Sequence, residues 1–244
     1  MLIGRKRILA RTACLGNDFI ARAFPKAKIH HYQKCRVDYI LDTLEKPNLR
    51  CRPDLAIPHL QNKDIALFLR QQESNFIHAP PAPVELIVID SFSELTDQRF
   101  THKKEGWSFL AHFTDVIHAV QFTTEFQSDG LLDLAKSYEH YSNLFDRLTV
   151  AYPRVPIIFI HFPTYLENRP KFHQRGEIIA SAIAKIQSKF PQLVVLKFDS
   201  TDIEPGCNAD GSQDSFPYHF GARTHHALQI KYREAMLQIS TKHA

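Results

Sequence analysis

An acid and a histidine stand close together near the end of the chain, in a polar loop before a final helix-like stretch. They are Asp214 and His219, in the run DSFPYHFG. Histidine is the side chain whose ordinary pKa lies nearest neutrality, and a carboxylate beside it can orient the ring and stabilise its charged form. The pair predicts general acid–base chemistry, with His219 as the base and Asp214 as its orienting acid. Asp199 and Asp202 stay open as alternative acids, because sequence alone does not fix loop geometry.

A second group of reactive side chains lies in the turn TACLGND, directly after the first apolar run. Cys14 offers a thiol and Thr12 a hydroxyl, while Gly16 permits a tight turn and Asn17 or Asp18 would cap a helix. Free backbone N–H groups at such a helix start favour an oxyanion, so Gly16 and Asn17 are the predicted donors. The structural alternative is that Cys14 is a small packing residue and that Asn17 or Asp18 is only a cap.

Three further polar residues follow apolar runs in the middle of the chain. Asp90 and Ser91 follow VELIVI, and His161 opens the polar–aromatic run HFPTYLENR, whose composition suits a sugar-binding rim and many other loops. We expect Asp90, Ser91 and His161 to contact substrate. His225 and His226 lie inside the final helical stretch and are expected to be solvated.

No metal and no cofactor is predicted. His161, His219 and Asp90 could meet in space, but no HxH or HExxH spacing supports a metal site. The chain has 8 glycines and neither GxGxxG nor GxxxxGK, which argues against nicotinamide and nucleotide chemistry.

Strand-like and helix-like runs alternate along the chain. Near-continuous apolar runs predict buried parallel strands at residues 7–12, 84–90, 156–162 and 193–199, with a weaker one at 27–32. Helical periodicity covers residues 131–150, 174–190 and 223–239. Alternating strands and helices predict an α/β fold: a three-layer α/β/α, flavodoxin-like parallel sheet of about five strands. Such sheets bind ligands at the carboxyl ends of their strands, where the reactive residues fall.

Composition bounds the remaining possibilities. We expect the 244 residues to form a single domain over 1–244, with the proline-rich stretch 79–83 as a stiff connector. The net charge of +4 is spread along the chain, so no nucleic-acid patch is expected. The four cysteines show no CxxC spacing, and no secretory signal or membrane span is seen, which predicts reduced thiols and a cytoplasmic protein. The oligomeric state is left open.

The order of elements, the turn after the first strand and the late acid–histidine pair resemble the SGNH (GDSL-like) hydrolase superfamily. The turn looks like the Gly-Ser-Cys turn of SGNH-like proteins tied to polysaccharide and cell-surface biosynthesis, with Thr12-Ala13-Cys14 in its place. The stretch from Asp90 to Arg99-Phe100 is similar to the Asp…Glu-Arg-Phe stretch of those proteins. The resemblance spans most of the chain and rests on short motifs.

The chain departs from the family pattern at the positions that matter for chemistry. The nucleophilic serine falls at Ala13, the acid of Asp-x-x-His falls at Phe216, and no Gly-x-Asn-Asp block is present. Three interpretations stay open: Cys14 is the nucleophile, which we rank first; the site has lost hydrolysis and only binds; or Thr12 serves as the nucleophile.

The resemblance implies an esterase or acyltransferase that acts on an acyl ester of a carbohydrate-type substrate, with an acyl donor as an open second substrate. The alternative is an inactive SGNH-like protein that binds a glycan or a partner in polysaccharide biosynthesis. A methyltransferase-type domain is the weakest interpretation, since the first turn lacks a glycine-rich loop.

Overall fold

The computed structural model describes residues 6–61, 65–78 and 83–242, with side chains up to residue 237. The predicted connector at residues 79–83 lies outside this range except for Pro83. Five parallel strands form the main sheet in the order β2-β1-β3-β7-β8. Their bounds are Arg7–Arg11 (β1), Lys28–Tyr32 (β2), Leu86–Asp90 (β3), Ile157–Ile160 (β7) and Leu193–Leu196 (β8). All five predicted strands are present, each shorter than predicted by one to three residues.

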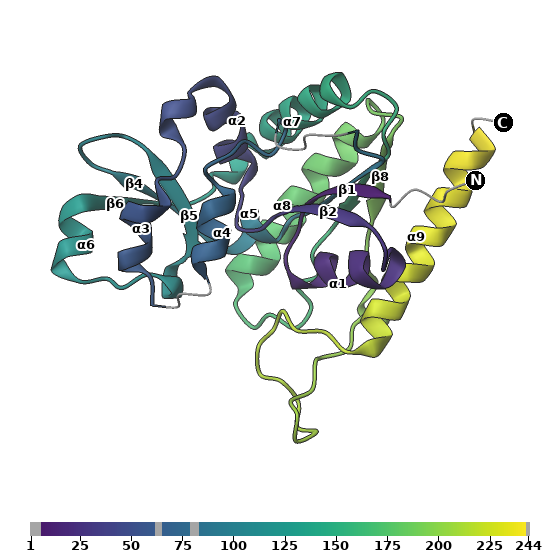
Figure 1. Ribbon diagram of the computed structural model, residues 1–244. Coiled ribbons are helices and arrows are strands. Elements are labelled where there is room, and N and C mark those ends of the chain that lie inside the picture. Colours follow the sequence, from purple (N-terminus) through teal and green to yellow (C-terminus); the bar gives the residue numbers. More distant parts are fainter. Residues whose placement is uncertain (1–5, 62–64, 79–82, 243–244) are drawn as a thin grey trace.

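Helices cover both faces of this sheet, as Figure 1 shows. On one face α1 packs against α9, where the rings of Phe19 and Tyr232 lie 5.2 Å apart. On the other face α2, α7 and α8 pack together, and Tyr141 of α7 meets Phe159 of β7 edge to face. The bounds are Cys14–Ala23 (α1), Val37–Glu45 (α2), Ser137–Ala151 (α7), Pro170–Gln187 (α8) and Ala222–Lys242 (α9). The predicted three-layer, flavodoxin-like fold is confirmed, because its strand order is that of this architecture.

The main sheet is buried on both sides because its strands are apolar without interruption. Ile8, Leu9, Ile87, Val88 and Ile158 are all fully inaccessible to solvent. The register pairs Leu9 with Ile87, so apolar side chains of neighbouring strands lie side by side in the sheet. This core holds the carboxyl ends of β1 and β3 side by side, at the point where the strand order reverses.

A second, antiparallel sheet was not predicted. It has the order β5-β4-β6, with bounds Asp97–His102 (β4), Ser108–His112 (β5) and Phe126–Leu131 (β6). Short helices Pro53–Ala56 (α3), Ala66–Gln71 (α4) and Val120–Glu125 (α6) lie beside it (Figure 1). A separate apolar cluster around Phe100, Trp107, Phe109 and Phe126 forms its core. That the two sheets belong to a single domain stays a prediction.

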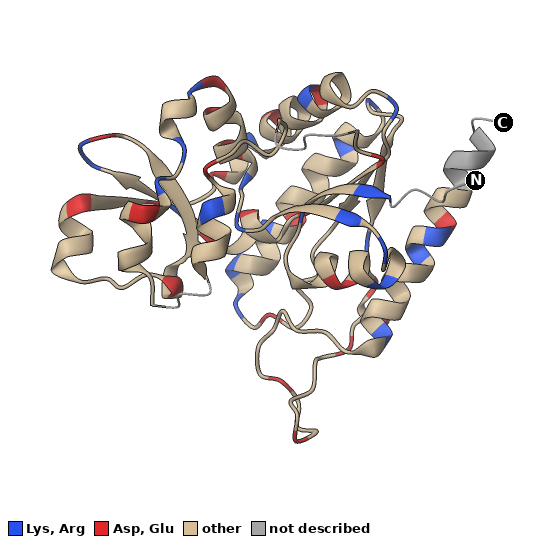
Figure 2. Ribbon diagram, viewed as in Figure 1, with Lys and Arg blue, Asp and Glu red and all other residues tan. Residues whose placement is uncertain are grey.

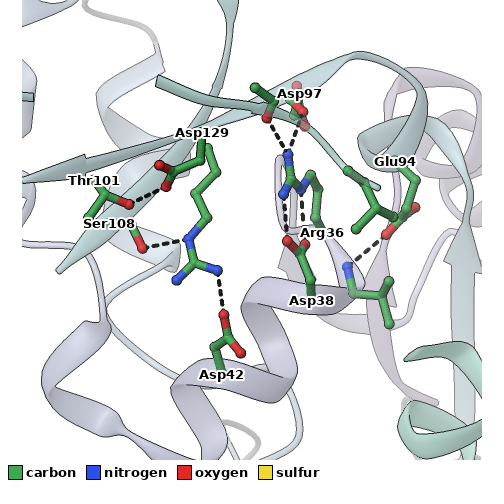
Figure 3. Close-up of polar contacts among 12 residues, drawn as sticks. Arg36, Asp38, Asp42, Glu94, Asp97, Thr101, Ser108 and Asp129 are labelled. Atoms are coloured by element: carbon green, nitrogen blue, oxygen red, sulfur yellow. Dashed lines mark hydrogen bonds and ion pairs between the residues drawn. The ribbon is translucent and has the colours of Figure 1, made fainter. Parts of the chain in front are cut away.

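Hydrogen bonds from a buried arginine join the start of α2 to the small sheet (Figure 3). The guanidinium of Arg36, just before α2, binds Asp38 and donates to the carbonyls of Asp97 (3.2 Å) and Gly130 (2.8 Å). Glu94 of α5 (Phe92–Thr96) accepts from the amide of Val37 at 2.8 Å. These contacts hold α2 against β4, β6 and α5, because charge-assisted hydrogen bonds are short and directional.

Candidate active site

The turn between β1 and α1 is held by the carboxylate of Asp90, at the end of β3. Its Oδ2 accepts from the amide of Ala13 at 2.7 Å and its Oδ1 from the amide of Phe92 at 3.1 Å. Asp90 is 2 % exposed, and burial raises its pKa to about 7. Ser91 is buried as well, and its Oγ accepts from the amide of Phe162 at 3.0 Å. Both predicted substrate-binding residues therefore have backbone partners within the protein.

The approach of α1 to β1 requires glycine at position 16. A Cβ there would lie 2.6 Å from Cβ of Thr12, closer than real Cβ contacts come. Thr12 is itself buried, and its Oγ1 lies 3.0 Å from Nε2 of His31. The predicted alternative nucleophile is thus engaged with β2.

The amides in the first turn of α1 differ in whether they have an acceptor within the helix. The amide of Asn17 donates to the carbonyl of Ala13 at 3.0 Å, so it closes the first helical hydrogen bond. The amides of Cys14, Leu15 and Gly16 precede it and have no intrahelical acceptor. Of the two predicted oxyanion donors, the amide of Gly16 has no acceptor within the helix, whereas the amide of Asn17 is used there. Their role as oxyanion donors stays a prediction.

Asp214 and His219 form the predicted pair in the loop between β8 and α9. Nδ1 of His219 lies 2.6 Å from Oδ2 of Asp214, and Oδ1 of Asp214 accepts from the amide of Phe216 at 2.8 Å. The Phe216 amide and His219 lower the pKa of Asp214, which keeps it a carboxylate. Because a carboxylate only accepts, Nδ1 carries the proton and Nε2 of neutral His219 is left with its lone pair.

Two backbone bonds across the base of the loop hold this pair. The amide of Gly206 donates to the carbonyl of His219 at 2.9 Å, and the amide of Asp214 donates to the carbonyl of Gly206 at 2.8 Å. The loop projects from the body of the protein in Figure 1. The alternative acids lie elsewhere, since Asp199 and Asp202 both bind Lys231, at 3.1 and 3.0 Å.

A cavity of about 230 Å³ lies between the start of α1 and the loop that bears His219. Cys14 and His219 both line it, although they stand at opposite ends of the sequence. The other lining residues are Leu15, Asp18, Gly206, Cys207, Asp214, Tyr218, Phe220 and His225. The first turn and the late acid–histidine loop therefore line one cavity.

The thiol of Cys14 is exposed at the first position of α1. Partial burial and the negative charges of Asp18 and Asp90 raise its pKa, while Lys34 opposes them. A thiol with a raised pKa is protonated at neutral pH, so a base must take its proton before sulfur can attack a carbonyl. Within the described part of the chain, no hydrogen bond joins this thiol to His219.

Asp18 and His225 form a second acid–histidine contact on the same cavity, which the sequence did not reveal. Nε2 of His225 lies 3.8 Å from Oδ2 of Asp18, and His225 is 8 % exposed. The expectation that His225 is solvated is wrong, because α9 turns this position toward α1. The available signal was Asp18 itself, one helical turn after Cys14 and on the same face.

His161 lies apart from this cavity, on a second one of about 220 Å³ beside α8. The three residues considered for a metal are therefore not brought together, and no group of three or more His, Cys, Asp or Glu side chains among the described residues is arranged to hold a metal ion. No helix in the described ranges is both long enough and apolar enough to cross a membrane.

Known proteins match this chain in structure and not in sequence. No protein-family model matches this chain, and no curated protein matches it in sequence. Solved structures do match. The salicylyl-acyltransferase SsfX3 from a tetracycline biosynthetic pathway is 10% identical, with 98% of this chain and 56% of that one covered and a TM-score of 0.42.

Two further structures match at a similar level. A protein proposed to be a GDSL-like lipase from Bacteroides ovatus is 10% identical, with coverage of 97% and 54% and a TM-score of 0.46. The acetyl xylan esterase Est2A from the rumen bacterium Butyrivibrio proteoclasticus is 12% identical, with coverage of 98% and 65% and a TM-score of 0.45. The chain thus spans between half and two thirds of these three proteins. Likeness at this level does not identify the activity of this chain.

Proposed function

We propose that this protein is an SGNH-like esterase or acyltransferase that acts on an acyl ester of a carbohydrate-type substrate. The observation that supports it most is the cavity shared by Cys14 and His219, with Asp214 on the far side of the imidazole. Acyl transfer needs a nucleophile, a base and an acid that orients the base, all at one cavity.

In the proposed mechanism, Nε2 of His219 takes the thiol proton of Cys14 while Sγ attacks the acyl carbonyl. The oxyanion forms beside the first-turn amides of α1, which are the donors without intrahelical acceptors. The intermediate collapses to a thioester, and the leaving alkoxide takes the proton back from His219. Water or a sugar hydroxyl then attacks the thioester and gives its proton to Nε2, which restores the thiol when the acyl product leaves.

The charge of the cavity favours an uncharged ester. Its lining includes the carboxylates of Asp18 and Asp214, and no lysine or arginine lines it among the described residues. The segment 198–221 likewise carries five acidic residues and no lysine or arginine (Figure 2). An acylated sugar suits these charges better than a donor with phosphate or carboxylate near its carbonyl, because like charges repel in a partly desolvated site.

Hydrolysis of p-nitrophenyl acetate tests the proposal. We expect turnover by the wild type, none above background in His219→Ala, and a reduced rate in Asp214→Asn and Cys14→Ser. His226→Ala is the matched control, because His226 is exposed on α9 and lines neither cavity. Acid-quenched wild type should carry one acetyl group on Cys14, detected by peptide mass spectrometry. Equal background rates in all five proteins would remove the esterase proposal.

The second candidate is an inactive protein that binds the same class of ligand. Two observations favour it: Ala13 has no nucleophile, and the surroundings of Cys14 raise the pKa of its thiol. Binding of an acetylated methyl glycoside, with no hydrolysis of either ester, would support this candidate over the enzyme.

A further inference from the structure

The second cavity lies between the loop after β7, one face of α8 and the end of β8. Its volume is about 220 Å³. The lining residues are His161, Phe162, Pro163, Thr164, Tyr165, His173, Gly176, Glu177, Ala180, Lys197 and Phe198. None of them lines the cavity of Cys14. Phe162 separates the two, since its ring lies 5.7 Å from Tyr218 and 5.6 Å from Phe220.

His161 brings free hydrogen-bonding capacity to this cavity. Neither ring nitrogen hydrogen-bonds to another residue in the described part of the chain, and Nε2 is buried without a partner. Burial and the nearby Lys197 lower the pKa of His161 to about 3, so the imidazole is neutral near neutral pH. A neutral imidazole offers one donor and one acceptor, and a buried polar group without a partner calls for an explanation.

Tyr165 provides an aromatic surface at the same cavity. Its side chain is 52 % exposed, yet its hydroxyl donates to the carbonyl of Phe198 at 3.1 Å, which restrains the ring. Because the ring is already restrained, little conformational entropy is lost when the flat apolar face of a ligand stacks on it.

The charged side chains of the cavity balance one another. Glu177 and Lys197 are both exposed and of opposite sign, and His161 is neutral, so the lining has no large net charge. A phosphate would face Glu177 and an ammonium would face Lys197. An uncharged ligand rich in hydroxyl groups can hydrogen-bond to both without a like-charge contact.

We propose that this cavity is a second binding site, which takes one uncharged pyranose ring stacked on Tyr165 and hydrogen-bonded by His161, Glu177 and Lys197. Its volume lies below the range of roughly 300–1,000 Å³ of drug-sized pockets, in keeping with one ring and not an oligosaccharide. The site does not depend on the proposed chemistry at Cys14, because the two cavities share no lining residue.

Saturation-transfer NMR with three probes tests this site: the methyl β-pyranosides of glucose, N-acetylglucosamine and xylose. Wild type should transfer saturation to the ring protons of at least one, and Tyr165→Ala should weaken its apparent affinity about three- to tenfold. Tyr138→Ala is the matched control, since Tyr138 is an exposed tyrosine too (40 %) but lies on α7 and lines neither cavity. His161→Phe, which removes the polar nitrogens and keeps a planar ring, should weaken binding as well.

His219→Ala separates this inference from the proposed function. It should abolish ester hydrolysis and leave pyranoside binding unchanged. No saturation transfer from wild type to any of the three probes would overturn the second site. Binding that persists in Tyr165→Ala and His161→Phe, or that is lost in His219→Ala, would overturn it too, because the sugar would then occupy another place.

Discussion

The hydroxyl of Tyr218 donates a hydrogen bond to the buried carboxylate of Glu167, and this contact ties the loop of His219 to the loop after β7. Glu167 also accepts from Nε (2.8 Å) and from the amide (3.0 Å) of Arg169, whose guanidinium lies over the ring of Phe172 at 4.2 Å. Several donors restrain the carboxylate of Glu167, and this carboxylate in turn restrains Tyr218. His219 is the next residue in the chain, so its position is restrained as well.

Tyr218→Phe should therefore slow the proposed reaction without removing any reacting group. We expect kcat for p-nitrophenyl acetate to fall about tenfold with KM nearly unchanged, because small misplacements of a base are costly. Stability should fall by about 1–3 kcal/mol, the usual cost of leaving a buried acceptor short of a donor. Tyr138→Phe is the control on an exposed tyrosine. An unaltered kcat in Tyr218→Phe would contradict a positioning role.

Glu167 should also make stability depend on acid pH. The hydrogen bonds from Arg169 and Tyr218 lower its pKa from 4.5 to about 2, against the opposing effect of burial. Between these values the unfolded chain binds more protons than the folded one, so stability falls as the pH falls from about 4.5 toward 2. Urea unfolding of wild type and Glu167→Gln over this interval should give a steeper loss for the wild type. Parallel curves would contradict the assignment.

Alkylation by iodoacetamide should report the surroundings of Cys14. The alkylation rate should rise with pH, and the midpoint of this rise should lie above 9.0, the ordinary pKa of a thiol, because burial and Asp18 raise the pKa of Cys14. Asp18→Asn should speed the reaction of Cys14 several-fold at pH 8 by removing a nearby negative charge. Cys207 is the internal comparison, since it is an exposed thiol on the same cavity. Labelled peptides separate the two rates, and no change in the Cys14 rate would show that Asp18 does not act on it.

Arg36 should cost more stability to remove than an arginine whose ion pair is exposed. It is 3 % exposed, and its loss leaves Asp38 and two backbone carbonyls without their donor (Figure 3). We expect Arg36→Leu to lower the free energy of unfolding by about 3–5 kcal/mol, as for other broken buried ion pairs. Arg52→Leu removes an exposed ion pair with Glu105 and should cost less than about 1 kcal/mol. Similar urea midpoints for both variants would refute the comparison.

The main sheet could be predicted because its evidence is local. Runs such as VELIVID and PIIFIHF are apolar on both faces, and this is the pattern of a covered parallel strand. The turn at Gly16 and the pair of Asp214 and His219 were readable for the same reason, since a few neighbouring residues define each. The start of α7 was placed six residues early, because Leu131 ends β6 and the next turn is a 3₁₀ turn.

The small sheet escaped prediction because its strands are mixed in composition. DQRFTH and FQSDGL contain many polar residues, and a bulge after Arg99 breaks their alternation. Phe100 and Phe126 are the aromatic residues buried in these strands, and they are covered by side chains that the pairing of the strands brings together, among them Trp107. β-structure of this kind depends on cross-strand neighbours more than on intrinsic preference.

The sequence by itself determined the order of parallel strands and helices, the tight first turn and the acid–histidine pair, because each follows from side chains within a few residues. Tertiary structure decided which of those groups meet. It gave Cys14 and His219 one cavity, turned His225 toward Asp18, and placed His161 in a second cavity behind Phe162. These contacts join distant segments through the crossing of α9 over α1 and the packing of α8, and no local pattern encodes such long-range geometry.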